Sequence, residues 1–98
     1  MNIQAMMKQA QKLQKDMMGA KEEIDNTIFE SKKSFLTMTA KGDKKIMSVK
    51  LDIDEIAKDD IETIEDLILV TCNDLMEKID KETEAKMGKF SQGMPGLF

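Results

Sequence analysis

The first 24 residues carry a hydrophobic pattern that predicts one long α-helix. Apolar side chains recur there in alternating steps of three and four residues, which places them on a single helix face. This seam consists of Ile3, Met6, Ala10, Leu13, Met17, Ala20 and Ile24. Lys8, Lys12 and Lys15 fall on the side that faces away from the seam. The helix is therefore expected to have one face suited to protein contact and one basic face.

A second stripe with the same spacing runs through residues 60–87 and predicts another long helix. Its members are Ile61, Ile64, Ile68, Cys72, Leu75 and Ile79. A helix of about 23 residues is roughly 35 Å long, whereas a compact chain of this size has a radius of gyration of only about 13 Å. With 98 residues, four Phe and no Trp or Tyr, the chain is too small to cover two such helices. We therefore expect a homodimer in which a second copy completes the core.

Between the helices, the hydrophobic period changes to two. Residues 27–31, 34–41 and 44–53 alternate in this way, which predicts three antiparallel strands, and Gly42-Asp43 predicts a two-residue hairpin turn. The expected register pairs Lys41 with Lys44, Met38 with Met47, Leu36 with Val49 and, through a turn at Lys32-Lys33, Phe29 with Leu36. Two apolar residues, Phe35 and Ile46, would lie on the opposite face. The predicted dimer contacts are Ile3, Met6, Ala10, Leu13, Met17, Phe35 and Ile46.

The expected fold class is α+β in a single domain over residues 1–98. A long N-terminal helix is followed by a three-stranded antiparallel sheet, a short helical turn and a long C-terminal helix. Asp59 with Glu62 three residues later predicts the start of the second helix, and Gly88 predicts its end. Residues 89–98 are expected to be a flexible tail. Neither a membrane-spanning run nor a signal peptide is visible in the sequence, so we expect a cytoplasmic location.

Enzymatic functions find little support in the sequence. There is no His, no base next to a Ser or Cys nucleophile, and no Gly-rich phosphate loop, so we expect neither catalysis nor a cofactor. The acidic cluster of Asp52, Asp54, Glu55, Asp59 and Asp60 lacks the central Gly and the terminal Glu of a calcium loop. Acids before a helix are explained by capping and the helix dipole, and no metal site is predicted. The single Cys72 lies among apolar neighbours and is expected to be a small core residue.

The charges are distributed unevenly along the chain. The net charge is −4, yet residues 1–50 contain ten Lys and six acids, while residues 51–98 contain five Lys and thirteen acids. A row of Lys is most often a solvated face, but a dimer would double the set on the first helix, and Lys32, Lys33, Lys44 and Lys45 add charge near the hairpin ends. All fifteen basic residues are Lys, which suits phosphate contact better than bidentate base recognition. We therefore expect contact with duplex DNA.

Three segments of the sequence resemble one protein family. They are MNIQAMMKQAQKLQKDM at the start, SVKLDIDEIAKDDIETIEDLILVTCNDLMEK in the middle and KMGKFSQGMPGLF at the end. Together they are similar to the YbaB/EbfC family of small bacterial nucleoid-associated proteins, and the resemblance runs through the whole chain. It implies a tweezer-like homodimer that binds double-stranded DNA with little sequence preference and acts in the nucleoid. The family's DNA contacts on its two long helices point to Lys8, Lys12 and Lys15, and on the second helix to Lys81, Lys86 and Lys89.

A second functional hypothesis is a protein-interaction adaptor. In that case the acidic second helix would dock a basic partner, such as a recombination or replication factor, and DNA contact would be incidental. The salt dependence of DNA binding separates the two hypotheses.

Overall fold

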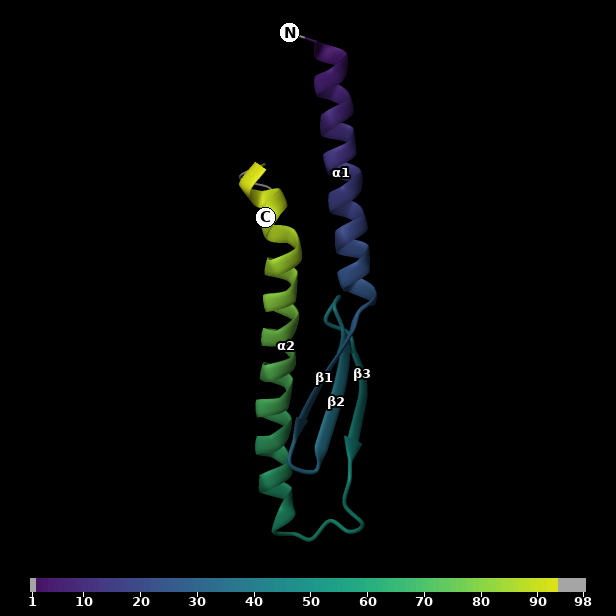
Figure 1. The fold of residues 1–98 in the computed structure, drawn as a ribbon. Helices are drawn as coiled ribbons and strands as arrows, with labels where there is room; N and C mark the ends of the chain where they lie inside the picture. The colour runs from purple at the N-terminus through teal and green to yellow at the C-terminus, as the bar shows by residue number, and fades with distance from the viewer. Residues whose placement is uncertain (1, 94–98) are drawn as a thin grey trace.

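A three-stranded sheet joins two long helices in a strongly elongated molecule (Figure 1). The computed structural model describes residues 2–93, and their side chains as far as Phe90. The elements are α1 (Ile3–Asn26), β1 (Ile28–Lys33), β2 (Leu36–Lys41), β3 (Ile46–Leu51) and α2 (Asp60–Gly93). This arrangement confirms the predicted α+β class and the long first helix.

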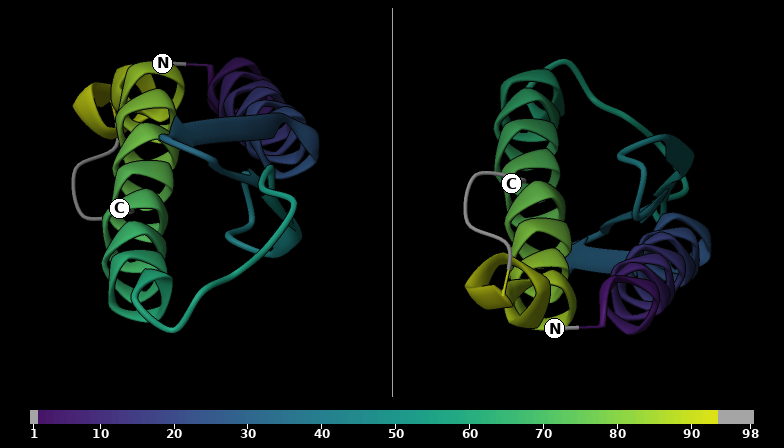
Figure 2. Two further views of the ribbon diagram at one scale, coloured as in Figure 1. Left: turned by 90° about the horizontal axis from the view of Figure 1, so that it is seen from below. Right: turned by 90° about the horizontal axis from the view of Figure 1, so that it is seen from above.

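The shape leaves much of α1 without cover. The molecule measures 72 × 19 × 14 Å and has a radius of gyration of 19.6 Å, compared with about 13 Å for a compact chain of this length. α1 and the sheet lie on the same side of α2, one above the other along its length (Figures 1 and 2). The N-terminal half of α1 extends past the described end of α2 (Figure 1). Residues 3–12 of the helix are exposed on all sides.

The sheet is antiparallel with the order β1-β2-β3, as predicted, but its register differs at both hairpins. Met38 lies opposite Val49 and not Met47, and Leu36 lies opposite Leu51. In the other pair, Phe29 lies opposite Ala40 and not Leu36. The first turn is at Ser34-Phe35, where the prediction placed it at Lys32-Lys33. The predicted register is therefore wrong, although Leu36 and Met38 do lie on the buried face.

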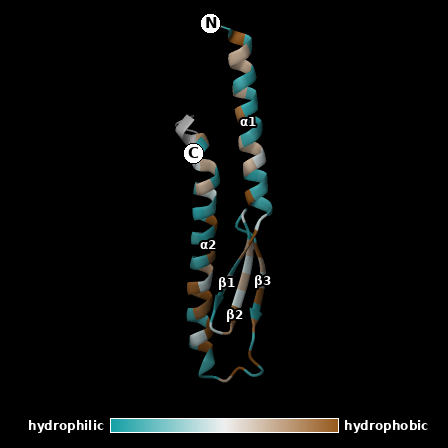
Figure 3. Cartoon of the chain, viewed as in Figure 1, coloured by the Kyte–Doolittle hydropathy of each residue, from teal (hydrophilic) through white to brown (hydrophobic). Residues whose placement is uncertain are grey.

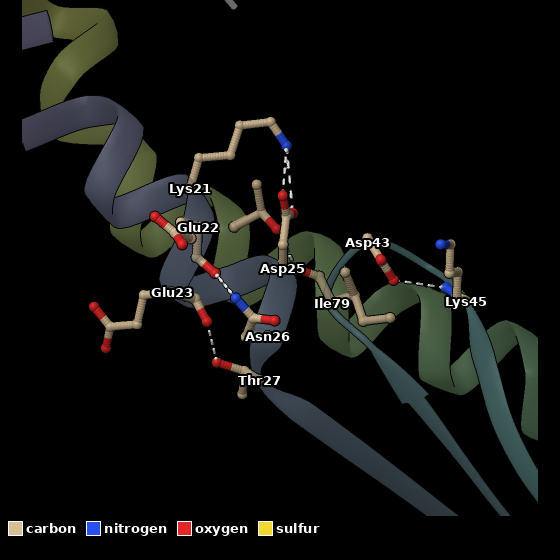
Figure 4. Close-up of polar contacts among 10 residues, drawn as sticks. Lys21, Glu22, Glu23, Asp25, Asn26, Thr27, Asp43, Lys45 and Ile79 are labelled. Carbon is tan, nitrogen blue, oxygen red and sulfur yellow. Dashed lines mark hydrogen bonds and ion pairs between the residues drawn. The ribbon is translucent and has the colours of Figure 1, made fainter. Parts of the chain in front are cut away.

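The β2–β3 turn is longer than predicted because of its backbone conformation. A two-residue type I′ turn needs positive φ at both Gly42 and Asp43, whereas in this turn it is Lys44 that has positive φ, at 71°. The Lys41 N–H consequently donates to the Lys45 carbonyl at 3.0 Å. The Asp43 carboxylate accepts the Lys45 N–H at 3.1 Å (Figure 4). The extra loop residue shifts the register by one position.

A bulge adds a second shift of one position within the same hairpin. It lies between Thr39 and Ala40 and brings Ile46 opposite Ala40. Ile46 therefore belongs to the face of Ala40, and its predicted place on the opposite face is wrong. Phe35, the other predicted exception, lies in the β1–β2 turn and is half-buried.

The main core lies between α2 and the first two strands. In the part of the chain that the structure describes, α2 packs closely on β1 and β2, whereas the backbone of β3 lies farther away and Leu51 at its end reaches the same core. The buried members of this core are Leu36, Met38, Ala40, Leu75 and Ile79. Ile61 and Ile68, from the N-terminal half of the predicted stripe, remain exposed. Cys72 is half-buried against this core, with its Sγ 3.8 Å from the Met38 Sδ, which agrees with a small apolar role.

α2 does not end at Gly88 as predicted but continues to Gly93. Beyond Gly88, Phe90 is buried with Met87 and Ile24 in a second, smaller core. Burial of an aromatic ring offsets the cost of about 1 kcal/mol for Gly within a helix. The predicted flexible tail therefore begins inside α2, and its last residues, 94–98, lie outside the described part of the chain.

At its other end, α2 begins at Asp60, one residue after the predicted cap at Asp59. The Asp60 carboxylate accepts the Ala57 N–H at 2.8 Å, and the Asp60 N–H donates to the Ala57 carbonyl at 2.9 Å. This closes the short turn that was expected before the helix. Neither helix, over its described residues, is apolar enough along its length to cross a membrane.

Candidate nucleic-acid interface

Hydrogen bonds at both ends of α1 fix the relative positions of the lysines on it. At the N-terminus, the Asn2 Oδ1 accepts the Ala5 N–H at 3.2 Å and caps the helix. At the C-terminus, the Thr27 hydroxyl donates to the Glu23 carbonyl at 2.7 Å (Figure 4). The Thr27 N–H also donates to the Ile24 carbonyl at 3.0 Å. α1 is thus a defined rod on which side chains have a regular spacing.

Lys8, Lys12 and Lys15 form an exposed row along this rod. They are four and three residues apart, so they share one face, and the row extends for about 10 Å along the helix axis. Within residues 2–93, none of the three ammonium groups has an ion pair or a hydrogen bond. Asp16 is the only acidic residue among the first 21. The row is therefore free to contact an anion, as predicted from the spacing alone.

Two of the other predicted DNA contacts are engaged within the chain. Lys86 lies 2.8 Å from a Glu23 carboxylate oxygen and 3.9 Å from Glu82. The hydrogen bond to Glu23 raises the pKa of Lys86, with partial burial acting in the opposite direction. Lys33 lies 3.7 Å from the Asp74 carboxylate. Lys86 thus connects α2 to α1, and Lys33 connects β1 to α2.

Lys32 and Lys89 are both exposed, in different settings. Lys32 lies on β1 and has no ion pair within the described residues. The Lys89 Nζ lies 5.0 Å from the centre of the Phe90 ring, which is a cation–π distance. Lys81, near the middle of α2, pairs with Glu77 at 3.1 Å. The three lysines of α1 are therefore grouped, whereas the other candidates are scattered.

The predicted dimer contacts on α1 divide into two groups. Leu13 and Met17 are half-buried and pack within the chain on the small core around Phe90. Ile3 and Met6 remain exposed, at 68% and 53% of their surface, and Ala10 is exposed beside them. The N-terminal half of the seam is therefore uncovered in the single chain.

Comparison with known proteins identifies the family. The family model described as "YbaB/EbfC DNA-binding family" matches residues 1–94. The chain belongs to the YbaB/EbfC DNA-binding family. A protein of Lactococcus lactis subsp. cremoris strain MG1363, named nucleoid-associated protein, is 44% identical over 97% of this chain and 98% of its own length. A Ligilactobacillus salivarius protein of the same name is 42% identical over 99% of this chain and 95% of its own length. Another, from Enterococcus faecalis, is 39% identical over 98% of this chain and 94% of its own length.

Membership of the YbaB/EbfC family agrees with the geometry of the chain. The family is described by DNA binding and not by a catalysed reaction. Among the described residues, no three His, Cys, Asp or Glu side chains come together as metal ligands. The acidic residues between β3 and α2 therefore form no cluster of this kind.

An uncovered apolar surface on β3 and α2 was missed by the sequence analysis. Met47 and Val49 on β3 are 52% and 55% exposed, because α2 lies closer to the other two strands. Leu69 and Val70 on α2 are 62% and 52% exposed. Figure 3 shows these hydrophobic stretches on β3 and on the lower part of α2. Four consecutive apolar residues at 67–70 cover more of the helix circumference than one stripe does. This run in the sequence could have predicted the exposed apolar surface.

Asp74 connects α2 to the edge strand β1. Its carboxylate accepts the hydroxyl of Ser31, a buried residue, at 2.6 Å and lies 3.4 Å from Lys78. The Ser31 hydrogen bond lowers the pKa of Asp74; partial burial opposes this shift, and Lys33 and Lys78 add to it. A carboxylate with a lowered pKa stabilises the fold above its unfolded pKa, near 4, and this contribution disappears as the pH falls through the folded value.

Replacement of Asp74 tests this link. Asp74→Asn should lower the melting temperature at pH 7 and should flatten the acid-induced loss of stability below about pH 4, because the titrating group is gone. Asp66→Asn, on the exposed part of α2, is the matched control. Thermal unfolding of both variants between pH 7 and pH 3 measures the effect. Identical pH profiles for Asp74→Asn and the parent would contradict it.

Proposed function

We propose that this chain binds double-stranded DNA, largely without sequence preference, through the Lys8, Lys12 and Lys15 row of α1. The observation that supports the proposal most directly is this unpaired row on the exposed side of α1, in a chain of a DNA-binding family. Relatives named nucleoid-associated proteins suggest the nucleoid, in the cytoplasm, as the place of action. Its role there would be chromosome organisation or regulation of gene expression.

The chemistry of the row favours phosphate contact over base recognition. Lysine ammonium groups are point charges that neutralise phosphates, whereas bidentate recognition of guanine is best made by the planar fork of Arg, which this chain lacks. No aromatic side chain occurs in the first 28 residues, so stacking of unpaired bases on α1 is not supported. The row therefore suits the sugar-phosphate backbone of a duplex.

We also propose that the functional unit is a homodimer. Ile3, Met6 and Ala10 on α1 are apolar and uncovered, and so is Ile46 with its neighbours on β3. Phe35, at the β1–β2 turn, and the partly covered Leu13 and Met17 would add to the contact. A second copy would bury this surface and place a second basic row at a fixed position relative to the first.

The salt dependence of binding tests the proposed contact. With about six phosphates contacted per dimer, the logarithm of affinity should fall with the logarithm of salt concentration at a slope of about −5. Lys8→Ala, Lys12→Ala and Lys15→Ala should each reduce this slope by about one to two units and weaken all DNA sequences alike. Gel-shift titrations at several salt concentrations measure both quantities. Lys58→Ala, near the acidic residues, is the control and should leave the slope unchanged.

The oligomeric state is tested by dilution. The midpoint of thermal unfolding should rise with protein concentration, since dissociation is coupled to unfolding. Leu13→Asp should lower this midpoint more than Lys12→Asp, because it introduces a carboxylate next to the small apolar core around Phe90. Sedimentation analysis that finds a folded monomer at micromolar concentration would contradict the proposed dimer.

A further inference from the structure

The end of α1 rests directly on the β2–β3 turn at Gly42. Gly42 is buried, and its N–H donates to the Thr27 carbonyl at 3.0 Å. A Cβ at this position would overlap the Ile24 carbonyl oxygen and would lie 2.5 Å from the Ile24 carbonyl carbon and 2.9 Å from its Cγ2. The obstacle is backbone and not the end of a flexible side chain. Only Gly allows α1 and the turn to approach this closely.

Two further contacts fix α1 near the same point. The Glu23 carboxylate accepts a hydrogen bond from Lys86 of α2 at 2.8 Å, one residue before Ile24. Ile24 itself packs with Met87 and Phe90 of α2. The β2–β3 turn is also joined to α2, through an ion pair of 2.9 Å between Lys44 and Asp80. α1, α2 and the turn are therefore held together within a few residues of Ile24.

A small change in the direction of α1 at this point would displace the N-terminal end of the helix by several ångströms. Lys8 lies 16 residues before Ile24, which corresponds to about 24 Å along the helix. A tilt of about 10° at Ile24 would move Lys8 by about 4 Å. Residues 3–12 of α1 are exposed, whereas Leu13, Met17 and Ala20 pack on the small core around Phe90, so a tilt at Ile24 would also disturb these contacts. The position of the basic row thus depends on the contact of α1 with Gly42, together with the packing of Leu13, Met17 and Ala20 on the small core.

We propose that Gly42 is a positioning residue for DNA binding: its lack of a side chain, together with the Glu23–Lys86 pair, sets the direction of α1 and hence the place of Lys8, Lys12 and Lys15. This inference rests on the proposed function. The sequence predicted that Lys86 contacts DNA. In the present proposal Lys86 instead holds α1 in place through its hydrogen bond to Glu23.

The direction of α1 can be measured without DNA. Nitroxide labels at Gln4→Cys on α1 and Glu84→Cys on α2, in a Cys72→Ser background, report the distance between the two helices. Labelled chains are diluted with unlabelled protein so that distances within one chain dominate. Gly42→Ala should shift the mean distance by about 3 to 5 Å, as expected for a tilt of a rigid helix. Gly19→Ala, which adds a Cβ in open space on α1, should leave it unchanged.

DNA binding provides the second measurement. Gly42→Ala removes no charge, yet it should lower the salt slope by about one unit and the affinity about tenfold, because fewer lysines reach phosphates together. If Gly42 were needed only for folding, Gly42→Ala would reduce the fraction of active protein but would leave the salt slope of DNA binding unchanged. Gly19→Ala should keep the parent slope. If folded Gly42→Ala keeps both the parent distance and the parent slope, the inference is wrong.

A milder variant covers the case in which Gly42→Ala does not fold. Glu23→Gln should broaden the distance distribution and lower the slope, and the charge exchange Glu23→Lys with Lys86→Glu should restore both. No change in Glu23→Gln, or no rescue by the exchange, would overturn the inference. If the distances shift as expected but parent binding does not depend on Lys8, Lys12 and Lys15, the positioning is supported and the proposed function is the part that fails.

Discussion

Met38→Lys should lower the free energy of unfolding by about 4 kcal/mol, which is a large part of the stability of a small domain. Met38 is 3% exposed between α2 and the sheet, and its Sδ contacts Cys72. A lysine there would lose its hydration among apolar side chains. The Asp74 carboxylate, which is bonded to the cross-strand neighbour Ser31, is already paired with Lys33 and Lys78. Urea denaturation followed by circular dichroism, at equal protein concentration, measures the difference.

The matched control is Thr37→Lys, one residue earlier on the same strand. Thr37 lies opposite Lys32 and Lys50 on the other face of the sheet, so the new charge stays hydrated and meets only like-charge repulsion. This variant should cost about 1 kcal/mol or less. If Thr37→Lys proved the more damaging of the two, the assignment of the buried face would be reversed.

The periodicity of the sequence was sufficient to predict the elements and the buried face of β2 but not the register or the burial of β3. Leu36 and Met38 were placed on the buried face because alternation alone decides which side of a strand is apolar. The pairing partners depend on turn conformations that the sequence does not reveal. Ser34 and Lys44 both have positive φ, at 55° and 71°, which non-glycine residues rarely adopt. A turn signal at Gly42-Asp43 therefore identified the hairpin but misplaced its register.

The same limit applies to the lysines. The row on α1 was predictable because its spacing lies within one helix and needs no tertiary information. The ion pair of Lys86 was not predictable, because its partner, Glu23, is 63 residues away and only the folded chain brings the two together. The link between Ser31 and Asp74 spans 43 residues and was equally invisible. Local patterns thus predicted which charges share a face, whereas pairing across elements decided which of them remain free.

Replacing Lys8, Lys12 and Lys15 together with Ala should nearly abolish DNA binding. If these side chains supply about six phosphate contacts per dimer, their loss should remove most of a salt slope of about −5 and weaken binding about 1000-fold near 50 mM salt. The fold should survive, because all three side chains are exposed and Ala is the best helix former. Circular dichroism verifies the helix content before binding is measured by gel shift.

A charge-matched variant separates a local contact from the effect of net charge. Lys41→Ala, Lys50→Ala and Lys58→Ala together remove the same three charges from other parts of the chain. This variant should change the slope by less than about one unit, since none of its lysines belongs to the row on α1. Parental binding by the α1 triple variant would show that α1 is not the contact surface. The adaptor hypothesis, with α2 as the docking element for a basic protein, would then account better for the acidic half of the chain.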